Sequence, residues 1–192
     1  ELEGVNLSGV DLRDIDLSAH DLRGANLSGA NVSIARLPRK LERVNLSGHD
    51  LSGLDLSDHD LTGSNLSGAN VSGARLPLKL EGVNLSGHNL SGLDLSGHDL
   101  SGANLSGANV SGARLPRQLE RVNLSGHDLS GLDLSDHDLS GGNLSETNLW
   151  NTNLSGSNLS GANVSGARLP RKMAGVNLSG VDLRDRDLSG HD

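Results

Sequence analysis

Histidine and aspartate are the residues with the greatest potential for chemistry in this sequence. Two segments place a histidine between aspartates, Asp58-His59-Asp60 and Asp136-His137-Asp138. Imidazole and carboxylate groups both bind zinc, so these segments are the first candidates for a metal site. Serine is abundant, but no pattern predicts a serine held beside a histidine and an aspartate in a pocket, as nucleophilic catalysis requires.

The composition excludes several classes of function. The 192 residues include no cysteine, and Trp150 is the single aromatic residue. The formal net charge of −8 disfavours nucleic acid as a partner, because a basic patch supplies most of that affinity. No apolar run approaches the ~20 residues that cross a bilayer, and no charged-then-apolar leader is present. We therefore expect no membrane contact, and we favour the cytoplasm although the compartment stays undetermined.

Leucine, or valine in its place, recurs at every fifth residue. Asparagine or aspartate precedes nearly every one of them, and Ser-Gly usually follows; the first members are Leu7, Leu12, Leu17, Leu22, Leu27, Val32 and Leu37. This period matches neither the two of a strand nor the 3.6 of a helix. The chain can bury all of these side chains only if it turns a corner at every step.

A longer period lies above the first. Near-identical segments begin at Val5, Val44, Val83 and Val122, at equal intervals of eight steps, and one step in each interval contains Leu-Pro and is a residue short. The next such segment begins at Val176, after three additional steps. We interpret residues 1–192 as a single repeat domain with super-repeats starting near 5, 44, 83, 122 and 176. Residues 146–160, which we call the insert, interrupt the regular pattern.

The five-residue unit resembles the pentapeptide-repeat family, whose motif is Ala-(Asp/Asn)-Leu-x-x. The clearest matches are the segments 25–29, 69–73 and 103–107, and the resemblance covers essentially the whole chain. It implies an all-β fold: a right-handed parallel β-helix solenoid with four-sided coils. The central leucine and the residue two before it then point inward.

Four steps in each coil make two coils of every super-repeat and give about nine to ten coils in all. The insert then adds three quarters of a coil. Pro170 is accordingly expected a quarter turn away from the line formed by Pro38, Pro77 and Pro116. Periodicity alone also permits a three-sided coil, in which the insert equals one full turn.

The implied geometry changes the interpretation of the histidines. Seven occupy the position two before a central leucine, so we expect them to point inward and to be structural: His20, His49, His59, His88, His98, His127 and His137. Outward aspartates point away from them, and histidines on one face are two coils, ~10 Å, apart. We therefore predict no metal ligands, no catalytic residues, no cofactor and no small-molecule substrate.

The surface offers two candidate contact regions. Arg36, Arg75 and Arg114 align beside the proline corners and predict a basic edge on an otherwise acidic rod. Trp150 follows a central leucine, so we expect it to be exposed. Trp150, Glu146 and Asn151 belong to the insert and are the candidate contacts for a partner.

These observations favour a non-enzymatic structural or scaffold module, part of a longer repeat array or self-associating, end to end or laterally. The alternative is a protein-binding module that docks a partner through a regular face and the insert. Some members of the family resemble B-form DNA and bind a topoisomerase, but the basic edge does not suit a DNA mimic. An idealised consensus sequence without a biological role is the third possibility.

Overall fold

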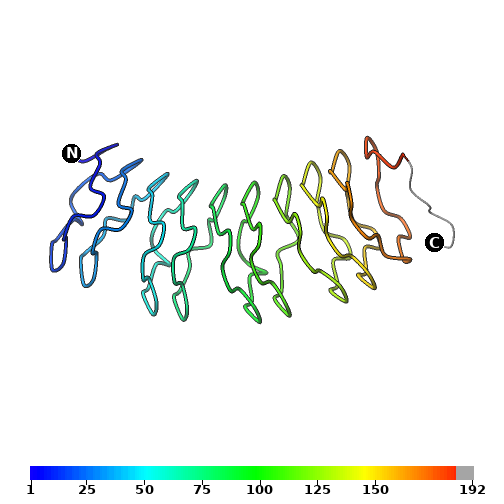
Figure 1. The fold of residues 1–192 in the computed structure, drawn as a ribbon, viewed down its shortest axis with the longest axis horizontal. Coiled ribbons are helices and arrows are strands. Elements are labelled where there is room, and N and C mark those ends of the chain that lie inside the picture. Colours follow the sequence, from blue (N-terminus) through cyan, green and yellow to red (C-terminus); the bar gives the residue numbers. More distant parts are fainter. Residues whose placement is uncertain (185–192) are drawn as a thin grey trace.

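The chain forms an elongated rod in which successive coils follow one another along a single axis (Figure 1). The computed structural model describes residues 1–184. These residues contain no helix, and so none that could span a membrane. The coil sides meet through isolated parallel bridges instead of extended strands, because each side is only one five-residue step long.

The bridges fix the number of sides in a coil. Asn6 pairs with Asn26, four full steps on, and Asn26 pairs with Asn45, one residue less than four full steps on, because the second coil contains the short Leu-Pro step. A three-sided coil would pair residues three steps apart, so that alternative is wrong. Each coil has four steps, and the prediction of a four-sided parallel β-helix is confirmed.

Leucine side chains fill the interior of the rod. Leu46, Leu66 and Leu85 are successive members of one column and are fully buried. The residue two before each of them is also buried, as Val44, Ser64 and Val83 show. Each coil thus buries its apolar side chains against the coils before and after it, as in other solenoids.

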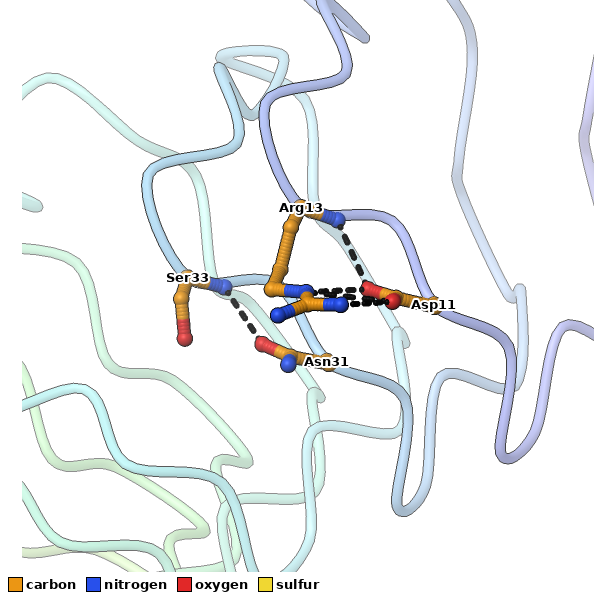
Figure 2. Close-up of polar contacts among 4 residues, drawn as sticks. All are labelled: Asp11, Arg13, Asn31 and Ser33. Carbon is orange, nitrogen blue, oxygen red and sulfur yellow. Dashed lines mark hydrogen bonds and ion pairs between the residues drawn. The ribbon is translucent and has the colours of Figure 1, made fainter.

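Asparagine and aspartate side chains hold the corners. In Figure 2, Asp11 Oδ1 accepts hydrogen bonds from the Arg13 backbone N–H at 3.2 Å and from Arg13 Nε at 2.9 Å. One coil later, Asn31 Oδ1 accepts the backbone N–H of Ser33 at 3.1 Å. The side chain supplies an acceptor to a backbone donor that the corner leaves without a backbone partner.

One side of the rod is bridged at every interface between coils from Asn6 to Asn163. We call it the asparagine face; it consists of Asn6, Asn26, Asn45, Asn65, Asn84, Asn104, Asn123, Asn143 and Asn163. Its side chains form a ladder, in which Asn26 Nδ2 donates to Asn6 Oδ1 at 3.1 Å and Asn45 Nδ2 donates to Asn26 Oδ1 at 3.0 Å. The asparagine face is the first side, and the second, third and fourth follow in chain order.

The other three sides are bridged less regularly. On the second side Asp50 pairs with Asn70, but no bridge among residues 1–184 joins Asn70 to Asn89. On the fourth side Lys79 pairs with Asp99, whereas Asp60 and Lys79 form no bridge. Before the insert the coils therefore associate in pairs away from the asparagine face, and Figure 1 shows their loops grouped along the lower edge. The short proline step produces this difference, because it withdraws one corner in every second coil.

The last residue of most steps adopts a positive φ, which suits glycine. Ile34 occupies this position with φ 55°, whereas Gly73 and Gly112 stand at the equivalent positions of the next two super-repeats. A β-branched residue is strained in the left-handed region, at a cost of about 1–2 kcal/mol. Ile34 is also 76% exposed, so its side chain contributes little burial.

We expect Ile34→Gly to raise the free energy of unfolding by about 1 kcal/mol, because relief of the strain exceeds the conformational entropy lost by glycine. Guanidinium unfolding followed by circular dichroism measures the change. The reverse substitution, Gly73→Ile, is the matched control and should destabilise the chain by a similar amount. A loss of stability in Ile34→Gly would contradict the prediction.

Candidate functional site

The histidines on the second side belong to the core. His49, His88 and His127 are 5, 4 and 4% exposed. The Nδ1 atom of His49 lies 3.0 Å from the carbonyl oxygen of Leu46. A carbonyl oxygen only accepts, so Nδ1 carries the proton and donates. The three rings are hydrogen-bonded to backbone carbonyl groups of the same corner, as expected of structural residues.

The histidines on the fourth side are less enclosed. His59, His98 and His137 are half-buried, and His20 is exposed. His20 lies in the first described coil, where its ring is not enclosed as expected. Beside His59, Asp58 pairs with Arg39 at 3.5 Å and Asp60 accepts the backbone N–H of Thr62. Within residues 1–184 no group of histidines and carboxylates could hold a metal ion.

The predicted basic edge consists of ion pairs. Arg75 lies 2.9 Å from Asp55, Arg114 lies 3.1 Å from Asp94, and Arg36 reaches to 3.9 Å from Asp16. Each arginine is bridged to its aspartate on the third side of the rod, one coil earlier. The charges of these three arginines are therefore compensated within the molecule, and the edge is not an open cationic surface.

The insert changes this pairing at the fourth proline corner. Bridges join Asp128 to Asn148 and Asn148 to Arg168, which places Arg168 on the second side. Pro170 therefore turns a corner one side earlier than Pro38, Pro77 and Pro116 do, and the expected quarter turn is observed. The residue beside Arg168 in the preceding coil is thus Asn148 in place of an aspartate.

Trp150 is half-buried, so the expectation of an exposed indole is wrong. The guanidinium carbon of Arg168 lies 4.3 Å from the centre of the Trp150 ring, and that of Arg171 lies 5.7 Å from it. Both distances fall within the range of cation–π attraction. The coil that follows the insert thus covers the indole with two arginines, which sequence position alone does not predict.

A groove continues from this stack. Arg171 and Lys172 line it together with four residues of the insert: Asn151, Thr152, Asn153 and Ser155. Among the ion pairs of residues 1–184, none involves Arg168, Arg171 or Lys172. We call Trp150 with these three cations the basic cluster.

The two other predicted contact residues take different roles. Asn151 is exposed and lines the groove with its neighbours. Glu146 continues the asparagine face and adopts a φ of 58°, as Asn151 does at 57°. The Glu146 carboxylate covers Gly166 in the next coil, where a Cβ atom would overlap with it. The structure therefore places Asn151 in the groove beside the basic cluster, whereas Glu146 packs on the following coil.

The four-sided coil of pentapeptides defines the class of fold. The family model for pentapeptide repeats matches residues 1–37, 40–76, 79–116 and 133–170 in 8 copies, and the chain belongs to this family. Its members fold as right-handed quadrilateral β-helices, so the predicted all-β solenoid is confirmed. Among curated proteins, none matches the chain.

Solved structures of three repeat proteins are similar to the chain. HetL, a pentapeptide repeat protein involved in heterocyst differentiation regulation in the cyanobacterium Nostoc sp., is 28% identical over 96% of this chain and 87% of its own, with a TM-score of 0.36. A pentapeptide repeat protein of the Arabidopsis thaliana thylakoid lumen is 35% identical over 54% and 70%, with a TM-score of 0.34. QnrB1, a plasmid-mediated fluoroquinolone resistance protein, is 24% identical over 80% and 81%, with a TM-score of 0.45.

Proposed function

We propose that the chain is a non-enzymatic scaffold module, a stiff rod that associates laterally with a second copy of itself through the asparagine face. The continuous ladder on this face is the observation that carries the proposal. It joins every coil from Asn6 to Asn163, whereas bridging on the other sides is interrupted. A backbone ladder without interruption over these coils stiffens the rod.

The chemistry of the same face favours contact with a second copy. Between Asn6 and Gly126 its outward residues are asparagine, serine and glycine throughout. The whole chain carries a net charge of −8, so two copies repel each other least along an uncharged face. Depletion of charged residues is also characteristic of the centre of protein interfaces.

Light scattering after size exclusion, over a concentration series with negative-stain images, tests this function. We expect pairs of rods whose proportion rises with concentration. Ser86→Glu places a carboxylate on the asparagine face and should shift the chain to monomer, because two copies would then bring like charges together. Ser91→Glu, one step later on the second side, is the matched control and should leave pairing unchanged. A monomer at every concentration would overturn lateral self-association.

A further inference from the structure

The basic cluster is the one place among residues 1–184 where an arginine that flanks a proline corner lacks the aspartate that its counterparts have. Arg36, Arg75 and Arg114 each face an aspartate, but Arg168 faces Asn148. We propose that the insert creates a docking site for an acidic segment of a partner protein at Trp150, Arg168, Arg171 and Lys172. This site is separate from the asparagine face.

Lys172, the second cation of this corner, also lies beside an asparagine where its counterpart lies beside an aspartate. Lys79 attracts the carboxylates of Asp60 and Asp99 and lowers the pKa of both, although the hydrogen bonds to Thr62 and Ser101 are the larger causes. Asp60 lies one coil before Lys79. The residue at the same distance before Lys172 is Asn153. Asn148 and Asn153 already donate their amide groups to Asp128 and Asp133 at 3.0 and 3.1 Å. The insert therefore keeps the side-chain ladder and removes the two negative charges that the preceding coil brings to the other proline corners.

Trp150 prepares the arginines for a ligand. An arginine stacked on an indole loses side-chain freedom before binding, and its N–H groups still point outward from the edge of the plane. The guanidinium is more weakly hydrated than an ammonium group, so it pairs readily with a carboxylate. The neighbouring groove adds the side chains of Asn151, Asn153 and Ser155 as polar surface.

The charge of the whole chain selects the class of ligand. A net charge of −8 repels nucleic acid, a polyanion that extends well beyond the basic cluster, whereas a short acidic segment contacts only the cations. A second copy of the chain is a poor ligand here, because it presents its aspartates on flat sides and brings the same net charge. An acidic segment of a different protein fits the observed charges best.

The experiment uses Trp150 as a built-in reporter. The chain has one tryptophan and no tyrosine, so its fluorescence reports on this site alone. We expect a saturable change in emission on titration with a short glutamate-rich peptide that lacks aromatic residues, and weaker binding as salt rises. A glutamine-rich peptide of the same length should produce no change.

Asn148→Asp restores the carboxylate found at the other corners and should weaken peptide binding about tenfold. Asn70→Asp is the matched control, since Asn70 also lies on the second side and donates to an aspartate of the preceding coil, Asp50, at 3.1 Å. It should change affinity less than about twofold, because added charge at a distance is screened. Thermal unfolding of both variants establishes that they are equally folded.

Three results would overturn the proposal. The first is the absence of saturable binding up to about 1 mM glutamate peptide. The second is equal loss of affinity in Asn148→Asp and Asn70→Asp, which would place the peptide elsewhere. The third is a stronger response to oligothymidylate, or to increasing protein concentration alone, which would assign the site to nucleic acid or to a second copy. Neither of the first two results bears on pairing through the asparagine face, which is measured separately.

Discussion

Leu85→Ala is expected to lower the free energy of unfolding by about 3 kcal/mol, the central value for a buried leucine whose removal leaves a cavity. Leu85 is fully buried on the asparagine face, with Leu66 before it and Leu105 after it in the same column. Few side chains could collapse into the space, because each side of a coil contributes only its central leucine and the residue two before it to the interior. Guanidinium unfolding followed by circular dichroism measures the loss.

Leu7→Ala is the matched control for position along the rod. Leu7 belongs to the same column but is only partly buried, because it lies in the first coil. We expect it to cost about 1 kcal/mol, since less apolar surface returns to water. Equal losses in the two variants would show that burial between neighbouring coils does not set stability, contrary to the solenoid model.

Acid is expected to destabilise the rod below about pH 4. The Ser57 hydroxyl and backbone N–H donate to Asp55 and hold its pKa below the ordinary value of 3.8. The side chain of Arg23 lowers the pKa of Asp21 further, to about 2. A carboxyl group whose pKa is depressed by folding stabilises the fold above its ordinary pKa and loses that contribution as the pH falls through the folded value. Stability should therefore decline from about pH 3.8 to about pH 2.

The same linkage predicts which substitution reduces the effect. Asp50 accepts the Ser52 N–H and an amide hydrogen bond from Asn70, and its pKa is lowered chiefly by Ser52. Asn89, the equivalent residue one super-repeat later, accepts the corresponding bonds without a charge. Asp50→Asn should keep the corner and reduce the proton uptake on acid unfolding by up to one. The slope of unfolding free energy against pH measures this uptake, and an unchanged slope would contradict the assignment.

Much of the fold follows from the sequence because the repeat leaves few alternatives. A five-residue period excludes helix and strand, and the resemblance of the unit to pentapeptide repeats supplies four sides to the coil. Burial of the histidines on the second side follows from the same repeat geometry. His20 departs from it, because enclosure on the fourth side depends on neighbouring coils that a single motif does not describe.

The arrangement at the candidate site was harder to predict, because it depends on the register between coils. Once a coil of four steps is established, the offset between Asp16 and Arg36 indicates an ion pair and that between Asn148 and Arg168 indicates its loss. These offsets were present in the sequence but have meaning only after the number of sides is fixed. The stack of Arg168 on Trp150 depends in addition on side-chain conformation, which no spacing specifies.

The quarter turn introduced by the insert has a consequence for how such a chain can change. Every step is one side of the coil, so adding or deleting whole steps leaves the inward positions inward. All later surface residues move together to another side of the rod. With the three added steps, the corner at Pro170 lies one side earlier than the other proline corners, and Arg168 lies on the second side beside Asn148. One further five-residue step would return that corner to the side of the coil on which Pro116 lies. The number of steps therefore sets both quantities: whole groups of four steps move a feature along the rod, and the remaining steps decide which side it occupies.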